Sequence, residues 1–203
     1  MEGARREIEF GVKEIITVIL ILLVGLLIRL YHINKPPLDF QPIRQYQVAH
    51  IVRGMYYEGL DSIPKWQKEI AEINKERIGF LLEPRILENI VVFFYRVFGY
   101  EALWIPRMIS SIFWIAGGFF LYLIGRNLFS LPLSFIALIF YLFLPFSLSA
   151  SRSFQPDSMM MMLTLIGIYG IVRYFKSPSW TTLIITTIPS SLAILIKPYS
   201  IFP

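Results

Sequence analysis

The sequence predicts an all-α membrane protein: a bundle of about five helices that cross the bilayer several times. Its residues are 56% hydrophobic and only 16% charged, whereas a soluble chain is roughly 45–50% apolar and about 25% charged. Five apolar runs also approach the roughly 20 residues that a helix needs to cross a bilayer. The aromatic content of 16% excludes disorder, and the absence of cysteine excludes disulfide scaffolds and cysteine-based metal or redox sites.

The five runs occupy residues 15–33, 108–125, 127–151, 158–172 and 177–196. The first follows basic residues, as a signal peptide would. Its apolar part is longer than a typical signal-peptide core of about 7–15 residues, however, and no small-x-small cleavage site follows it. We therefore expect a retained anchor, in which Arg29 extends along the helix to the membrane surface.

Lysine and arginine in short loops predict how the bundle is oriented. They precede the first run and occupy the turns after the second and fourth: Arg5, Arg6, Lys13, Arg126, Arg173 and Lys176. All of them fall on the cytoplasmic side if residues 34–106 make no net crossing. We expect a multi-pass protein of the plasma (inner) membrane with a cytoplasmic N-terminus. The net charge of +5 is dispersed between apolar runs, which favours a membrane role over nucleic-acid binding.

Residues 34–106 are predicted to be the first extracytoplasmic loop, and residues 107–203 the helical bundle, within one membrane domain. In the loop, Val48, Ile51, Val52 and Met55 have the spacing of an amphipathic helix, as do Trp66, Ile70 and Ile73. Such helices can lie in the membrane interface. The apolar run 90–98 is too short to span, so we expect a juxtamembrane or re-entrant helix.

This topology gathers a set of polar residues at the outer surface: Asp39, Glu83, Asp157, Arg44, Arg85, Arg152 and Lys197. Together they suit a lipid-phosphate substrate, because cations bind phosphate and a carboxylate can take a proton from an attacking hydroxyl. The pattern alone leaves two simpler interpretations open. Asp157 precedes a helix and can act only as its N-terminal cap. Lys197, at a helix end before Pro198, can act only as a membrane-surface anchor.

Several short segments appear together in a characteristic order. They are PPLDFQPIRQY (36–46), LEPR (82–85), FYRVFG (94–99), IPR (105–107), SRSFQPD (151–157) and ILIKP (194–198). This order resembles the N-terminal half of the polytopic, lipid-sugar-dependent glycosyltransferases of the GT-C fold. That superfamily includes the dolichyl-phosphate-mannose protein mannosyltransferases and the bacterial aminoarabinose transferases of lipid A. Because members are usually about twice as long, we expect this chain to be a truncated or N-terminal part.

The resemblance implies roles for individual residues. Asp39 matches a catalytic acidic residue of the first outer loop, and Asp157 matches the acidic residue of the second. Glu83 resembles a carboxylate that helps to bind metal or substrate, which makes it a candidate ligand for a divalent cation. Lys197 matches a basic residue near the lipid phosphate. Arg44, Arg152 and Arg85 are further candidates for phosphate binding, and no nucleotide cofactor is expected.

The expected function is therefore transfer of a monosaccharide from a polyprenyl-phosphate donor to a lipid, glycan or protein acceptor on the extracytoplasmic side. Asp39 would act as general base. A rival hypothesis is a non-catalytic membrane subunit or lipid-sugar-binding protein that keeps the cations without turnover. The co-occurrence of carboxylates and cations favours the enzyme. A transporter would carry ionisable groups at membrane depth, whereas those of residues 108–196 lie at helix ends or in turns.

Overall fold

The computed structural model describes residues 10–78 and 84–201. All regular structure in these residues is helical, which confirms the predicted all-α class. The helices are α1 (Val12–Leu30), α2 (Pro42–Glu58), α3 (Lys65–Ile78), α4 (Ile86–Phe98), α5 (Trp104–Leu128), α6 (Leu131–Phe143), α7 (Pro145–Ala150), α8 (Asp157–Lys176) and α9 (Trp180–Ile196), followed by the 3₁₀ helix η1 (Pro198–Ile201).

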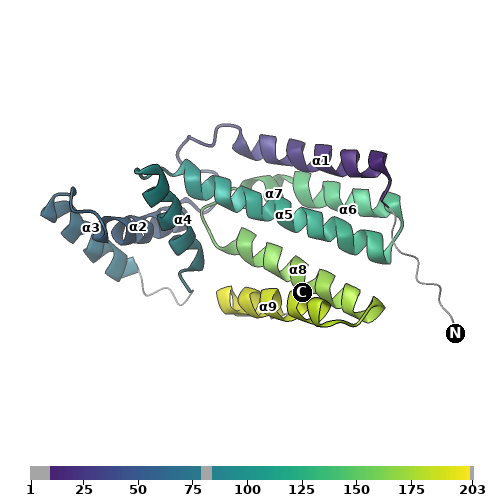
Figure 1. Cartoon of the computed structure of the whole chain (residues 1–203). Coiled ribbons are helices and arrows are strands. Elements are labelled where there is room, and N and C mark those ends of the chain that lie inside the picture. The colour runs from purple at the N-terminus through teal and green to yellow at the C-terminus, as the bar shows by residue number, and fades with distance from the viewer. Residues whose placement is uncertain (1–9, 79–83, 202–203) are drawn as a thin grey trace.

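The long helices form a bundle, and α2, α3 and α4 gather at one end of it (Figure 1). Helix α5 packs against α1, α6 and α8, and α8 packs against α9. Among the described helices, α5 and α8 are long and apolar enough to cross a membrane, whereas α6 and α9 are apolar but shorter. Helix α1 is 19 residues long and contains Lys13, Glu14 and Arg29. The predicted number of about five crossings stays a prediction.

The third apolar run is not one continuous helix, contrary to expectation. It divides into α6 and α7 at Leu144, whose backbone is extended with ψ at 138°. The reason is Pro145, which lacks an N–H for the carbonyl four residues earlier and disfavours a helical conformation in the residue before it. The break leaves carbonyl groups at the end of α6 that need other partners.

The predicted amphipathic helices of residues 34–106 are present. Helix α2 buries Val48, Ile51 and Val52, each at most 2% exposed. In α3, by contrast, the apolar residues remain exposed: Trp66 at 60% and Ile70 at 51%. An apolar face that no protein segment covers suits the predicted position of α3 at a lipid interface.

Two groups of buried apolar side chains hold the elements together. The first joins α2 and α4 to α5, α8 and α9, with Val52, Leu87 and Ile105 each 0% exposed. The second lies between α1, α5 and α6 and includes Trp114 and Leu142. The first group is the one that fixes the α2–α4 layer onto the end of the bundle.

Glycines bring neighbouring helices close together. A Cβ atom at Gly117 would lie 2.7 Å from the Tyr141 hydroxyl on α6. Between α8 and α9 the neighbouring atom belongs to the backbone, because a Cβ atom at Gly170 would lie 2.7 Å from the backbone nitrogen of Thr186. Helices α8 and α9 therefore depend on a glycine at this crossing.

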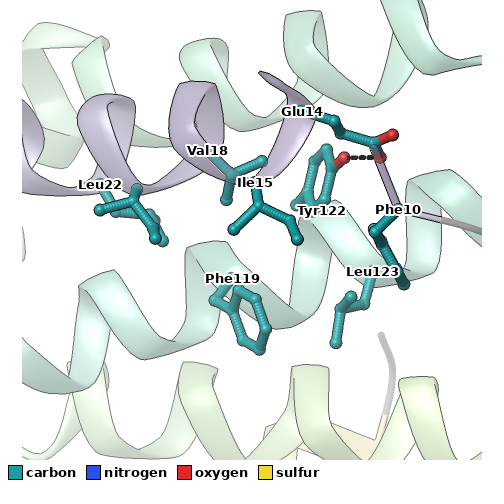
Figure 2. A pocket seen from close by; sticks show the side chains of 9 residues that line it. Phe10, Glu14, Ile15, Val18, Leu22, Phe119, Tyr122 and Leu123 are labelled. Carbon is teal, nitrogen blue, oxygen red and sulfur yellow. Dashed lines mark hydrogen bonds between the residues drawn. The ribbon is translucent and has the colours of Figure 1, made fainter. Parts of the chain in front are cut away.

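The end of the bundle opposite α2–α4 contains an ion pair between α1 and α5. Glu14 accepts hydrogen bonds from Tyr122 and from Arg126, and Figure 2 shows its carboxylate turned towards the Tyr122 hydroxyl. Beside this pair, a groove of about 300 Å³ is lined mainly by apolar side chains, including Val18 and Phe119. The basic turn residues expected on the cytoplasmic side, Arg126, Arg173 and Lys176, lie at this end of helices α5 and α8.

Candidate functional site

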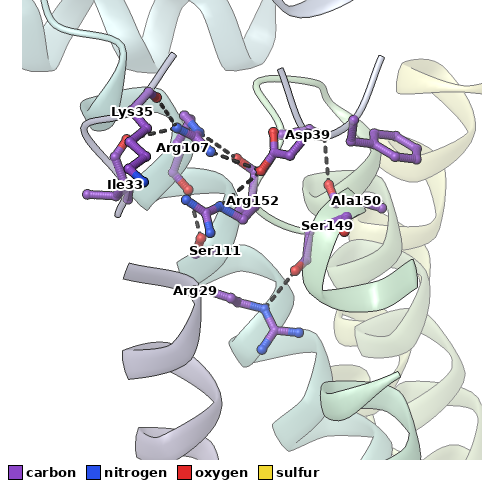
Figure 3. Close-up of polar contacts among 12 residues, drawn as sticks. Arg29, Ile33, Lys35, Asp39, Arg107, Ser111, Ser149, Ala150 and Arg152 are labelled. Carbon is purple, nitrogen blue, oxygen red and sulfur yellow. Dashed lines mark hydrogen bonds and ion pairs between the residues drawn. The ribbon is translucent and has the colours of Figure 1, made fainter. Parts of the chain in front are cut away.

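A buried arginine at the start of α5 connects three separate stretches of the chain. The guanidinium of Arg107 is 1% exposed. Its Nη1 donates to the carbonyls of Ile33 at 2.8 Å and Lys35 at 2.7 Å, and its Nη2 donates to Oδ2 of Asp39 at 3.1 Å. Its Nε donates to the Arg152 carbonyl at 3.4 Å. Figure 3 shows Arg107 with its partners around it. Because a buried charge is tolerated only when paired and hydrogen-bonded, Arg107 strongly specifies this arrangement.

Asp39 lies between two arginines. Besides the bond from Arg107, its Oδ2 atom is 3.3 Å from Nε of Arg152. That second contact is an ion pair without hydrogen-bond geometry, since Arg152 Nε has no hydrogen-bond partner among the described residues. The Asp39 side chain is 34% exposed and that of Arg152 is 16% exposed. The structure thus brings together two residues that the sequence predicts for the site, and both remain in reach of a ligand.

A second carboxylate cluster forms where α8 begins and α9 ends. Oδ1 of Asp157 accepts from Lys197 Nζ at 2.8 Å and from the Tyr199 hydroxyl at 3.1 Å. The other oxygen, Oδ2, is buried and accepts no hydrogen bond from the described residues. Burial, followed by the neighbouring Asp157, raises the pKa of Tyr199, so this phenol stays a neutral donor.

These contacts exclude both simpler interpretations. The N-cap of α8 is Pro156, no side chain caps the helix, and Asp157 is the first helical residue. Asp157 pairs with Lys197 instead. Lys197 does not extend to the membrane surface as a solvated anchor, because its side chain is 14% exposed and bonded to Asp157. Both residues are therefore partners across two helices.

One connecting segment, residues 151–157, contributes Arg152 to the first cluster and Asp157 to the second. The side-chain amide of Gln45 links this segment to the first loop. The buried Gln45 on α2 accepts from the backbone N–H of Phe154 at 2.9 Å and donates to the carbonyl of Phe40. Ser158 donates to the Ser151 carbonyl at 3.1 Å, which closes the segment on itself. Gln45 therefore holds the segment of Arg152 and Asp157 beside the loop of Asp39.

Arg29 is not a surface anchor, and that expectation was wrong. It is 1% exposed, and its Nε donates to the Ser151 hydroxyl at 2.6 Å. Its Nη2 donates to the Leu142 carbonyl at 2.8 Å, and its Nη1 to the Gly25 carbonyl at 2.8 Å. The break at Pro145 makes the Leu142 carbonyl available, because α6 ends before it can pair within the helix. Arg29 thus fixes both the end of α6 and the first residue of the 151–157 segment.

Sequence reasoning did not select Arg29 or Arg107 as site residues. In the sequence, each of these arginines is a single charge in or beside an apolar run. The same pattern is typical of a side chain that extends to the membrane surface. Arg107 lies near the start of α5, directly after Pro106. Only the packing of α5 against the loop shows where its donors go.

The other predicted site residues have different positions. Arg44 is half-buried on the first turn of α2. Arg85 is the N-cap residue of α4, where its carbonyl accepts from Asn89, and the two carboxylate clusters are complete without it. Glu83, the candidate metal ligand, lies outside the described residues.

The chain also matches a known family. Residues 83–202 match the family described as dolichyl-phosphate-mannose-protein mannosyltransferase. The chain belongs to this family. It is therefore related, at family level, to membrane glycosyltransferases that use a lipid-linked sugar. No curated protein and no solved structure gave a significant match.

The range shared with the mannosyltransferase family includes part of the site. It contains Arg107, Arg152, Asp157 and Lys197, whereas Asp39 precedes it. Arg107 and Arg152 nevertheless make direct contacts with Asp39. The loop that contains Asp39 thus belongs to the same site as Arg107 and Arg152, although it precedes the matched range.

The described carboxylates do not form a metal centre. No group of three or more His, Cys, Asp or Glu residues among them is placed to hold a metal ion. Asp39 is paired with arginines and Asp157 with a lysine, so the donor sets around them are cationic and do not suit a divalent cation. The prediction that Glu83 binds a metal ion stays a prediction.

Proposed function

We propose that this protein transfers a monosaccharide from a polyprenyl-phosphate donor to a lipid, glycan or protein acceptor, at the extracytoplasmic face of the plasma (inner) membrane. The observation that supports this most is the contact of Asp39 with both Arg107 and Arg152 at one end of the bundle. A carboxylate beside cations, with the Asp157–Lys197 pair on the same connecting segment, provides a base and phosphate-binding groups in one region.

In the proposed reaction, Asp39 is the general base. Its contacts with Arg107 and Arg152 are through Oδ2, so Oδ1 is the oxygen that takes the proton from the acceptor hydroxyl. As it loses this proton, the oxygen of the acceptor hydroxyl attacks the anomeric carbon of the donor. The bond from that carbon to the phosphate oxygen breaks, and its electron pair leaves with the polyprenyl phosphate. Arg107 keeps the carboxylate oriented throughout.

Cations at the site neutralise the phosphate as it leaves. Arg152 and Lys197 are suited to this because both side chains are partly exposed, at 16% and 14%, and lie on or against the 151–157 segment. Arg44 and Arg85 are additional candidates in the α2–α4 layer. Fixed charges that face a developing charge are commonly among the largest contributions to catalysis. Asp157 positions Lys197 through the 2.8 Å bond.

The proposed orientation follows from the two ends of the bundle. The basic residues Arg126, Arg173 and Lys176 lie at the end away from α2–α4. Positive residues in short loops favour the cytoplasm. The Asp39 and Asp157 clusters then face outwards, in a multi-pass protein whose α3 and α4 lie at the interface.

Asp39→Asn tests the role of the base. Membranes containing the full-length protein would be given polyprenyl-phosphate sugars, and release of free lipid phosphate would be followed. We expect Asp39→Asn to abolish transfer while insertion is unchanged, because asparagine keeps an acceptor for Arg107 but cannot take a proton. Asp61→Asn, in the exposed turn between α2 and α3, is the matched control and should transfer normally.

Three outcomes would contradict the proposal. Full transfer by Asp39→Asn would remove Asp39 from the mechanism. Transfer supported by nucleotide sugars alone would contradict the donor. Donor binding without turnover in the wild type would favour the lipid-sugar-binding alternative.

A further inference from the structure

A second cavity lies in the α2–α4 layer, apart from the Asp39 cluster. Its volume is about 380 Å³, within the roughly 300–1,000 Å³ of small-molecule sites. Its walls come from the end of α2, the turn after α2, and the connection from α4 to α5. The lining includes three tyrosines and several polar groups: Tyr56, Tyr57, Tyr100, Ser62, Arg96 and Glu101. Aromatic surfaces are thus combined with a carboxylate, a guanidinium and a hydroxyl.

The carboxylate of this cavity is held in a fixed position. Arg53 Nε lies 2.9 Å from Glu101 Oε2, and its Nη2 lies 2.9 Å from Oε1. The Tyr57 hydroxyl donates to Oε1 at 3.3 Å. Burial, followed by Glu101, raises the pKa of Tyr57, so this phenol remains a neutral donor. Since a carboxylate has about four lone-pair sites, Glu101 retains acceptor capacity for a ligand.

Two glycines shape the cavity and its cationic edge. Gly99 ends α4 with φ at +77°, a conformation that side chains rarely adopt, and so directs Tyr100 and Glu101 into the lining. A Cβ atom at Gly59 would lie 3.2 Å from Arg96 Nη2. The absence of that atom lets the exposed guanidinium lie across the end of α2. Tyr100, at 48% exposed, is open to a ligand.

We propose that this cavity binds a saccharide unit of the acceptor, an inference that rests on the proposed glycosyltransferase function. The C–H face of a sugar ring packs against an aromatic ring, while Glu101, Arg96 and the tyrosine hydroxyls pair with its hydroxyl groups. Strand addition, one common way of binding a peptide, needs a strand edge, and the described part of the chain contains no strand. The combination of aromatic rings with a carboxylate, a guanidinium and hydroxyl groups in the lining matches the many hydroxyl groups of a saccharide, which favours a saccharide over a peptide.

The position of the cavity indicates an elongated acceptor. Tyr57 follows Gln45 by 12 residues on α2, which corresponds to about 18 Å along a helix. Gln45 is bonded to the loop of Asp39. A sugar in the cavity is thus several units from the hydroxyl that reacts at Asp39, and the acceptor is an oligosaccharide.

Direct binding tests this proposal without relying on transfer. The full-length protein in detergent would be titrated with mannotetraose, maltotetraose and chitotetraose by saturation-transfer NMR and calorimetry. We expect at least one to bind, and Tyr100→Ala and Arg96→Gln each to weaken it by about fivefold or more. Tyr174→Ala, equally an exposed tyrosine but on α8, and Arg77→Gln on α3 are matched controls that should bind normally.

The proposal would be overturned if none of the three saccharides bound, or if both cavity variants bound like wild type. Binding of a serine- and threonine-rich peptide that Tyr100→Ala weakens, when no saccharide binds, would also overturn it in favour of a peptide site. Kinetics separate it from the proposed function. If Tyr100→Ala and Arg96→Gln raise the KM for the acceptor and leave the KM for the donor unchanged, the result supports acceptor binding in the cavity. Saccharide binding that depends on Tyr100 supports the cavity even if wild type shows no transfer, which would refute the transferase function alone.

Discussion

Arg107 offers a quantitative test of how the site is assembled, because one side chain holds three segments together. Arg107→Met removes the donors to the Ile33 and Lys35 carbonyls and to Asp39. Methionine has a similar length and keeps the apolar packing of the Arg107 side-chain stem. The change therefore isolates the loss of the charge and its hydrogen bonds.

The expected cost follows from the burial of the guanidinium. Arg107 is 1% exposed and bonded to two carbonyls at 2.7–2.8 Å, and each buried carbonyl that loses its donor costs about 1–3 kcal/mol, so the two together cost about 2–6 kcal/mol. For a chain of this size each kcal/mol lowers the melting temperature by roughly 2–4 °C. We therefore expect the melting temperature to decrease by roughly 4–24 °C. Transfer should fall as well, because Asp39 loses its orienting partner.

The assay combines thermal unfolding of the purified protein with the rate of lipid-phosphate release. Arg107→Lys is the informative companion, because a lysine keeps the charge but cannot match the planar array of donors. It should recover part of the stability and little of the rate. If Arg107→Met melts and transfers like wild type, the reasoning that Arg107 organises the site is refuted.

Three further predictions follow from other contacts. Gly170→Ala should lower the free energy of unfolding by about 1–3 kcal/mol, because the added Cβ meets the backbone of Thr186. The control is Gly11→Ala, whose Cβ would have no atom within 4 Å. Equal melting temperatures of the two variants would contradict the close packing of α8 and α9. Arg29→Met should leave the Leu142 carbonyl without its partner, at about 1–3 kcal/mol, and speed amide exchange in residues 151–157; unchanged exchange would show that the segment is held otherwise. Asp157→Asn should change the free energy of unfolding by at most about 1 kcal/mol, since its side chain is 36% exposed, yet reduce transfer. A full rate in the membrane assay would exclude a role for the Asp157–Lys197 pair.

Membership of the mannosyltransferase family and the contacts of the site support different parts of the proposal. The family match covers residues 83–202 and so includes the proposed phosphate-binding residues Arg152 and Lys197. It does not include Asp39, whose proposed role rests on its contacts with Arg107 and Arg152. Experiments on Asp39 therefore test the mechanism, and donor screening tests the substrate.

Local pattern predicted most of the fold. Apolar runs and amphipathic spacing depend on neighbours three or four residues apart, which is why the helices of residues 48–55 and 66–73 are present in α2 and α3. The break at Leu144 was missed although Pro145 is visible in the sequence. Hydrophobicity alone cannot distinguish a continuous helix from two helices joined at a proline.

The sequence by itself determined the helical class, the family and four of the polar residues that the structure brings into ion pairs: Asp39, Arg152, Asp157 and Lys197. Only the tertiary structure decided which of them pair. Arg107 reaches Asp39 across 68 residues, and Arg29 reaches Ser151 across 122. The local pattern around each arginine is equally typical of a surface anchor. Whether its charge is solvated or buried depends on which distant carbonyls and carboxylates the packing of α1, α5 and α6 brings within hydrogen-bonding distance.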